Sequence, residues 1–258
     1  MANPTLTKEF GKLPPTNAAA DAALSSANVP YDVRTDDPMT IGGVSAKTAF
    51  LLVLVVGAGS WGWGLVDPET GGSSLPGWWF LVAIGALVLA IVTAFKPKIA
   101  IVTGPLYAVT QGVLLGVISH FYDIRFEGIV VQAILATAAV FLGMLILFVT
   151  GAIKVTDRFR GIVIGATFGI FILYIGSFVM SFFGWSSPVY SSGAFGIGIS
   201  LFIVAIAALN LMLDFDMIVR GVNAGAPKYL EWYGAFGLMV TIIWLYIEIL
   251  RLLGKTRS

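Results

Sequence analysis

Seven long apolar stretches fill most of this chain, and they constrain its fold more than any other feature. They lie at about 48–66, 78–95, 99–119, 129–151, 161–183, 194–213 and 234–253. About 18 consecutive apolar residues are enough for a helix to span the core of a bilayer. The stretches are continuous rather than alternating, which favours helices over the strands of a barrel. We therefore predict an all-α membrane protein with seven transmembrane helices in residues 47–258.

The composition agrees with a membrane protein and excludes several other classes. Hydrophobic residues make up 58% of the chain and charged residues 11%, whereas soluble domains carry about 25% charged residues. A net charge of +1 without a basic stripe argues against a nucleic-acid partner. The chain has no cysteine and one histidine, His120, so thiolate sites and histidine-rich metal clusters are excluded. We expect His120 to be an exposed residue rather than a pH sensor.

The first 46 residues differ from the rest. They are polar, rich in Ala, Pro, Asn, Thr and Asp, and contain the turn pairs Pro14-Pro15 and Asp37-Pro38. They contain no apolar core of a secretory signal, so the first apolar stretch should serve as its own insertion signal. We predict a mostly flexible N-terminal tail, residues 1–46, with short helical pieces as an alternative near Ala18–Leu24.

Basic residues predict the orientation of the chain. Eight lie just before the first stretch or in the connections after the second, fourth and sixth, while the opposite connections hold only Arg125. The eight are Lys47, Lys96, Lys98, Lys154, Arg158, Arg160, Arg220 and Lys228. This asymmetry places the N-terminus in the cytoplasm. Seven crossings then put Arg251, Lys255 and Arg257 outside; a re-entrant last stretch is the alternative.

Three acidic residues are the strongest functional candidates. Glu248 lies within the last apolar stretch, and Asp214 and Asp216 close the sixth. A carboxylate at membrane depth costs roughly 2.5–3.5 kcal/mol on insertion scales, so it is rarely kept without a purpose. Asp214 and Asp216 point about 200° apart on a helix, so both cannot face one cavity. The structural alternatives are ion pairs of Asp216 with Arg220 and of Glu248 with Arg251.

Glycines at four-residue spacing indicate close helix packing. Gly161, Gly165 and Gly169 form one stripe, and Gly112 and Gly116 form another. Small residues let helix backbones approach closely in lipid. We expect both stripes to pack within the chain, and a dimer interface is the alternative.

The ends of the last two stretches resemble a known family. The sequence Asp214-Phe-Asp-Met-Ile-Val is followed by a polar turn and by Leu245-Tyr246-Ile247-Glu248-Ile249-Leu250. This order is similar to the closing signature of Bax inhibitor-1/YccA-like proteins, and the tail resembles that of actinobacterial members. The resemblance implies seven helices with the last one central and wrapped by the other six, in a bacterial plasma membrane. It also implies a pH-sensitive calcium leak channel rather than an enzyme.

In that family the two acids share a proton, and they carry over here as Asp214 and Glu248. Two touching carboxylates cannot both ionise, and losing the shared proton would leave facing anions and hard oxygen ligands for calcium. Three features depart from the family pattern: Asp216 replaces a Gln, Glu248 replaces an Asp, and the two acids are 34 positions apart. Contact would need an unwound end of the sixth helix or an interfacial segment at 228–234.

Several polar residues could support these acids, although a plain helix–helix hydrogen bond is the preferred interpretation for each uncharged one. The first group of candidates is Tyr246, Asn210, Arg220 and Arg251, and the second is Tyr107, Tyr174, Thr110 and Gln111. Calcium ions, protons and lipid are the expected partners.

A second hypothesis is an interaction protein that modulates the membrane protease FtsH through the tail. A secondary transporter is less favoured because the halves show no repeat. An intramembrane protease is less favoured because no Gly-x-Gly-Asp or Tyr-Asp motif surrounds the aspartates.

Overall fold

The computed structural model describes residues 37–66, 79–184, 191 and 193–258. Within these ranges the chain forms seven α-helices, one 3-10 turn and no strand. The helices are α3 (Ile41–Trp63), α4 (Trp79–Phe95), α5 (Ala100–Arg125), α6 (Ile129–Val149), α7 (Asp157–Phe182), α8 (Ala194–Asn223) and α9 (Leu230–Arg257). Six helical segments are long and apolar enough to cross a membrane, while α4, with 17 residues, is shorter. The all-helical membrane fold is thus confirmed.

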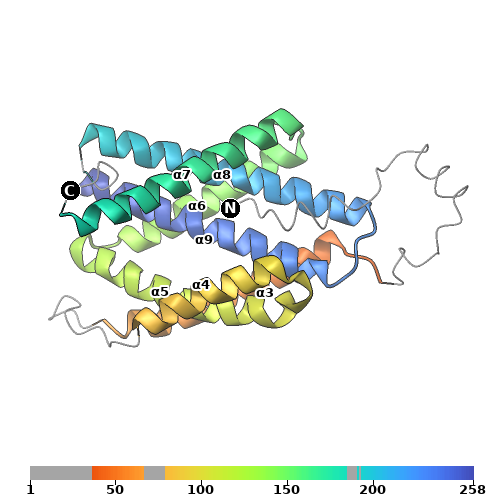
Figure 1. Ribbon diagram of the computed structural model, residues 1–258, viewed down its shortest axis with the longest axis horizontal. Coiled ribbons are helices and arrows are strands. Elements are labelled where there is room, and N and C mark those ends of the chain that lie inside the picture. Colours follow the sequence, from red (N-terminus) through yellow and green to blue (C-terminus); the bar gives the residue numbers. More distant parts are fainter. Residues whose placement is uncertain (1–36, 67–78, 185–190, 192) are drawn as a thin grey trace, which may run out of the picture.

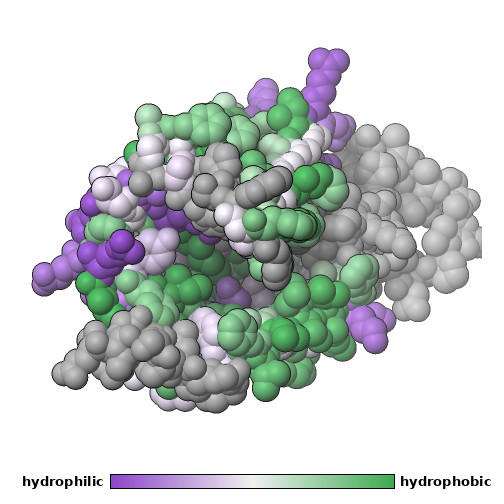
Figure 2. Space-filling view, turned by 60° about the vertical axis from the view of Figure 1, so that its left-hand side comes forward, coloured by the Kyte–Doolittle hydropathy of each residue, from purple (hydrophilic) through white to green (hydrophobic). Residues whose placement is uncertain are grey.

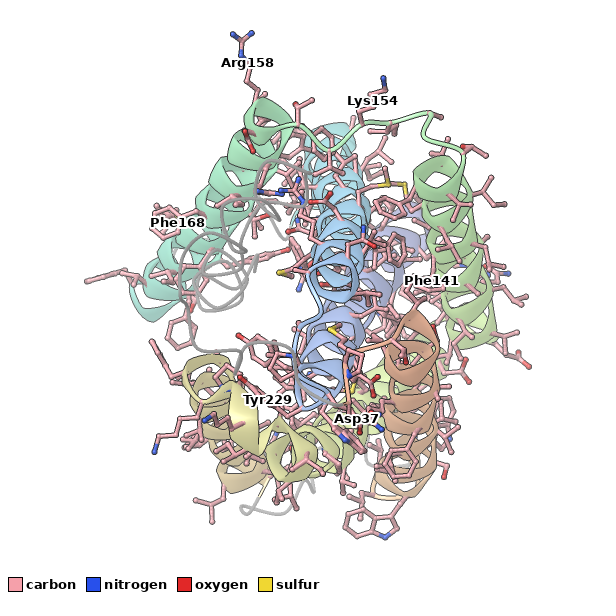
Figure 3. All side chains as sticks on the ribbon, turned by 90° about the vertical axis from the view of Figure 1, so that its right-hand side faces the viewer. Asp37, Phe141, Lys154, Arg158, Phe168 and Tyr229 are labelled. Carbon is pink, nitrogen blue, oxygen red and sulfur yellow. The ribbon has the colours of Figure 1, made fainter. Side chains whose placement is uncertain are left out.

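The helices run back and forth along one axis (Figure 1). The proximal end of the bundle is where α3, α5, α7 and α9 begin and α4, α6 and α8 end; the distal end is the opposite one. All eight basic residues that predict the orientation lie in the proximal half or in its connections. Figure 3 looks at this end and shows Lys154 and Arg158 pointing away from the bundle.

Helix α9 contacts each of the other six helices. It packs along α3, α5, α6 and α8, and it runs between the α7–α8 pair and the group formed by α3, α4 and α5 (Figure 1). The Tyr233 hydroxyl donates a hydrogen bond to the Ala94 carbonyl of α4 at 3.2 Å. The Tyr174 hydroxyl of α7 reaches Glu248. Side chains on α9 are therefore buried by protein rather than by lipid.

Glycines bring α3 and α5 into backbone contact. A Cβ added to Gly62 would overlap the Val113 backbone, and one added to Gly116 would overlap the Gly59 backbone. Gly112 lies equally close to Val55. The predicted packing role of Gly112 and Gly116 is confirmed, because no larger residue fits between these helices.

The glycine stripe on α7 behaves differently. No atom of another described residue lies within 4 Å of the position that a Cβ would take on Gly161, Gly165 or Gly169. Among the described helices α7 packs chiefly on α8, and this stripe faces away from it. Within the described part of the chain, the stripe therefore does not pack against another helix as expected. Phe168, on the same helix, also points outward (Figure 3).

Large apolar side chains cover the outside of the bundle. Figure 2 shows hydrophobic surface over much of the outward helix faces, with hydrophilic side chains gathered in patches. Phe80 and Leu81 on α4, Val149 on α6 and Ile162 on α7 are each about 70% exposed. Such a surface is unfavourable in water and suits contact with lipid chains.

The chain enters the bundle at Ile41, within the segment expected to be tail. Thr40 caps α3 by accepting a hydrogen bond from the Gly43 N–H at 2.9 Å. The Thr40 N–H and hydroxyl also donate to Glu231 at 2.9 and 3.0 Å, and Lys47 pairs with the same carboxylate. Buried Glu231 thus joins the starts of α3 and α9. Residues 1–36 of the predicted tail lie outside the described residues.

Candidate functional site

Glu248 is held by two side chains near the middle of the distal half. Its carboxylate is buried, at 1% exposure. The Tyr174 hydroxyl of α7 donates to it at 2.7 Å, and Arg251, one turn later on α9, donates to both oxygens at 3.3 and 3.2 Å. Arg251 also donates to the Tyr174 oxygen, and its guanidinium lies 5.0 Å from the centre of that ring. The alternative ion pair of Glu248 with Arg251 is therefore the observed arrangement.

Lys255 extends this polar cluster toward the distal end. Its ammonium is buried and donates to the Gly196 carbonyl at 3.0 Å and to the Ser200 hydroxyl at 2.7 Å. Both acceptors belong to the first two turns of α8. Glu248, Arg251 and Lys255 thus form one line of charge along α9 and join it to α7 and α8.

Asp214 lies in a different environment, on α8. Its side chain is buried at 6% exposure, and the Thr241 side chain of α9 interacts with its carboxyl. The carboxyl oxygen Oδ2 is buried and has no hydrogen-bond partner among the described residues. A buried carboxylate without a donor is costly, and burial of this kind favours the neutral, protonated acid.

Asn210 lies one helical turn before Asp214, on the same face of α8. It is 2% exposed. Its amide nitrogen donates to the Ile206 carbonyl and to the Thr167 hydroxyl of α7, both at 2.8 Å. Its amide oxygen, Oδ1, is buried and without a partner among the described residues. Two unsatisfied acceptors therefore lie one turn apart on one helix.

The structure does not bring Asp214 and Glu248 together. Asp214 faces Thr241, which precedes Glu248 by seven positions on α9. Seven residues correspond to about 10 Å along a helix axis. No hydrogen bond or ion pair joins the two acids in the described part of the chain. The physical reason is that α8 stays helical to Asn223 and α9 starts at Leu230, so neither the unwound end nor the interfacial segment that contact requires is present.

The closing sequence that carries the family resemblance is therefore folded into two adjacent helices with buried acids. The profile of the family described as "Bax inhibitor 1 like" matches residues 3–258. The chain belongs to the Bax inhibitor-1-like family. Comparison with curated proteins and with solved structures gave no significant match. Membership agrees with the six long apolar helical segments, and together they identify a multi-pass membrane protein.

Asp216 belongs to an ion-pair cluster at the proximal end of α8. Its Oδ2 accepts from Arg160 of α7 at 2.7 Å and from Arg220 at 2.9 Å. Arg160 also lies 3.7 Å from Asp157. The predicted pair with Arg220 is confirmed, and the cluster fastens α7 to the proximal end of α8. Neither Asp216 nor Arg220 lies with Asp214, because they point to another side of the helix.

Two other sequence expectations are settled by position. Tyr246 bonds to Ser119 of α5 at 2.7 Å, so it does not support either acid directly. His120 is buried rather than exposed: its ring stacks on Trp63 at 4.4 Å, and its Nδ1 donates to the Trp63 carbonyl at 2.8 Å. The exposed position expected for His120 was wrong.

Sequence reasoning missed Thr167, Thr241 and Lys255. A signal for Thr167 was present, since it lies seven positions before Tyr174 and so shares a face of α7 with it. Thr241 has the same spacing from Glu248 on α9. Lys255 lies beyond the last apolar stretch, which stops at residue 253, whereas α9 continues to Arg257.

The expected calcium ligands are also separate. No group of three acidic, histidine or cysteine residues that could hold a metal ion occurs in the described ranges. Asp214 and Glu248 can each offer a carboxylate, but not to one ion in this conformation.

Proposed function

We propose that this protein is a proton-controlled cation leak in the bacterial plasma membrane, with calcium as the most suitable ion. The observation that supports this best is the Asp214 carboxyl, which is buried on α8 facing α9 and has one oxygen without a hydrogen-bond partner among the described residues. A group of this kind binds a proton reversibly, and its charge changes when the proton leaves. Membership of the Bax inhibitor-1-like family agrees with the proposal. No enzymatic step is part of it.

In this proposal the two acids act at separate depths. With Asp214 protonated, the region between α8 and α9 carries no net charge and stays dry. Loss of the proton places an unpaired anion there, which favours entry of water and of a cation. Glu248 acts as the second carboxylate on the pathway once it separates from Arg251. Calcium takes six to eight oxygen ligands, so water and hydroxyl groups must complete its shell.

The topology in this proposal has seven crossings and a cytoplasmic N-terminus. The described part of helix α4 has 17 residues, or about 26 Å at 1.5 Å per residue, which is close to the bilayer core of about 30 Å. The eight basic residues at the proximal end support a cytoplasmic location of that end.

Calcium flux into proteoliposomes tests this function. The full-length protein should admit calcium at a rate that changes between mildly acidic and mildly alkaline pH. Asp214→Asn should remove most of this pH dependence, and Glu248→Gln should alter the rate. Asp157→Asn is a matched control, because Asp157 is an acid on α7 that is almost fully exposed. Flux that is the same in empty liposomes, or that ignores both variants, would overturn the proposal.

A second candidate function is modulation of an FtsH-type membrane protease. The observation that favours it is the attachment of the chain before α3 to the α8–α9 connection. The Met39 N–H donates to the Ala226 carbonyl at 2.7 Å, and Lys228 pairs with Asp37 at 2.6 Å. A partner protein that binds the tail could therefore displace the α8–α9 connection.

Deletion of residues 1–36 separates the two functions, because it leaves these contacts intact. If the protease binds the tail, the truncated protein should no longer co-purify with the protease, while its calcium flux should persist. Retained co-purification would exclude a tail-dependent interaction.

A further inference from the structure

A protonated Asp214 carboxyl needs a hydrogen-bond acceptor, and Glu248 is not close enough to be that acceptor. Asp214 Oδ2 and Asn210 Oδ1 are both buried and unpartnered in the described residues, and both are acceptors when Asp214 is ionised. Two buried acceptors one turn apart repel each other. Protonation of Asp214 gives both oxygens a hydrogen-bond partner, because the Asp214 O–H can donate to the Asn210 oxygen.

The hydrogen-bond partners of the Asn210 amide determine which of its two atoms is the nitrogen and which is the oxygen. The Ile206 carbonyl can only accept, so the amide nitrogen must face it. The Thr167 hydroxyl donates to the Val163 carbonyl at 2.9 Å, so it accepts from the same nitrogen. With both N–H groups used toward the preceding turn and α7, the oxygen is left for the following turn, where Asp214 lies.

Charged groups on the neighbouring helices are paired elsewhere. On α7, Arg160 binds Asp216; on α9, Arg251 binds Glu248. Helix α6 contains no charged residue. The one charge on α3, Lys47, binds Glu231 at the proximal end.

Three further ionisable side chains on α7 and α9 bond to other groups. Tyr174 bonds to Glu248, Tyr246 bonds to Ser119, and Lys255 bonds to the start of α8.

We propose that Asn210 is the proton-holding partner of Asp214, and that loss of this proton is passed to α7 through Thr167. The proton leaves to water. The Asn210 amide then turns its nitrogen toward the new carboxylate, which breaks its bonds to Ile206 and Thr167. This inference deepens the proposed function by naming where the proton is held, and its first readout does not depend on ion flux.

Helix α7 is suited to carry the signal onward. Thr167 and Tyr174 are seven positions apart, so they lie on one face of α7. The first touches the Asp214–Asn210 pair through Asn210, and the second touches Glu248. Helix α7 packs chiefly on α8, so it can shift at lower cost than the closely packed α3 and α5. A rearrangement at Thr167 therefore reaches Glu248, two turns away, without contact between the two acids.

Infrared spectroscopy of the full-length protein in liposomes tests the proton site. At mildly acidic pH the spectrum should contain the C=O band of a protonated, hydrogen-bonded carboxyl. Asp214→Asn should remove this band, Glu248→Gln should keep it, and Asn210→Leu should move it to the frequency of an acid without a hydrogen bond. If Asn210→Leu does not fold, Asn210→Ala makes the same test. A band that survives Asp214→Asn, or that does not move when Asn210 is replaced, overturns the proposal. An Asp214 carboxylate that stays ionised at mildly acidic pH, and whose band shifts when sodium or calcium is added, overturns it as well.

Spin labels test transmission to α7. The chain has no cysteine, so labels can be placed at Phe168 on α7 and Leu142 on α6, which are 62% and 54% exposed. The distance between them should change with pH in the otherwise unaltered chain. Thr167→Val should suppress this change while leaving the Asp214 carboxyl band in place; an unaffected distance change overturns the transmission step. If flux is absent but both spectroscopic results hold, the proposed function fails and this inference stands.

Discussion

Tyr174 of α7 donates a 2.7 Å hydrogen bond to Glu248 of α9, although the two helices make little other contact. The same hydroxyl accepts from Arg251, so one tyrosine orders both members of a buried ion pair. An acid on the central helix is thereby tied to the helix that is packed most loosely. In a pore that opens through these helices, this bond has to break.

Removing this hydroxyl should therefore favour the open state. Tyr174→Phe should raise calcium flux several-fold and lower the free energy of unfolding by about 0.6 kcal/mol, the average for hydrogen bonds between membrane helices, and by at most about 1.7 kcal/mol. Proteoliposome flux and denaturant unfolding in detergent measure the two effects. Tyr246→Phe is the matched control, since it removes a 2.7 Å bond to Ser119 of α5; it should cost similar stability and leave flux unchanged. Equal flux effects in the two variants would contradict the gating role of Tyr174.

Arg251 should matter more for stability than either tyrosine. Glu248 is buried, and Arg251→Met would leave its charge without a cation. Breaking one side of a buried pair costs about 3–5 kcal/mol, whereas replacing both partners is often close to neutral. The double variant Arg251→Met with Glu248→Gln should thus be more stable than Arg251→Met alone in denaturant unfolding. A double variant that is less stable than both single variants would show that the pair itself stabilises the fold.

Much of the fold followed from the sequence, because continuous apolar stretches of spanning length permit few structures other than helices. All seven helices appear, and the ion pairs of Asp216 and Glu248 followed from helical spacing. The separation of Asp214 and Glu248 did not follow, since a few turns of unwound backbone would change it. Whether α8 stays helical past Asp214 depends on tertiary packing rather than on local residues. The sequence also could not predict which way the glycine stripe of α7 faces, because Gly161 and Gly165 permit close packing without requiring it.

The two glycine stripes give a direct test of the packing. Gly116→Ala should destabilise the protein by about 1–3 kcal/mol, because its Cβ would overlap the Gly59 backbone and helices α3 and α5 would have to separate. Gly165→Ala on α7 should be neutral or slightly stabilising, since no described residue lies near the added Cβ and alanine is the better helix former. Thermal unfolding in one detergent compares them. Similar losses in both variants would mean that the α7 stripe is packed against another helix in the membrane.

The link between Lys228 and Asp37 should take no part in pH sensing. The Asp37 carboxylate raises the pKa of Lys228, which is exposed on the connection before α9. A cation whose pKa is raised by folding contributes its stability fully below the pKa of the unfolded chain, about 10.4, and loses it only as the pH rises through the folded value. The link is therefore unchanged across neutral pH. Lys228→Gln should leave the pH dependence of calcium flux as it was, while Asp214→Asn should flatten it. A changed pH profile of calcium flux in Lys228→Gln would indicate that the pH sensor lies in the α8–α9 connection rather than in the bundle interior.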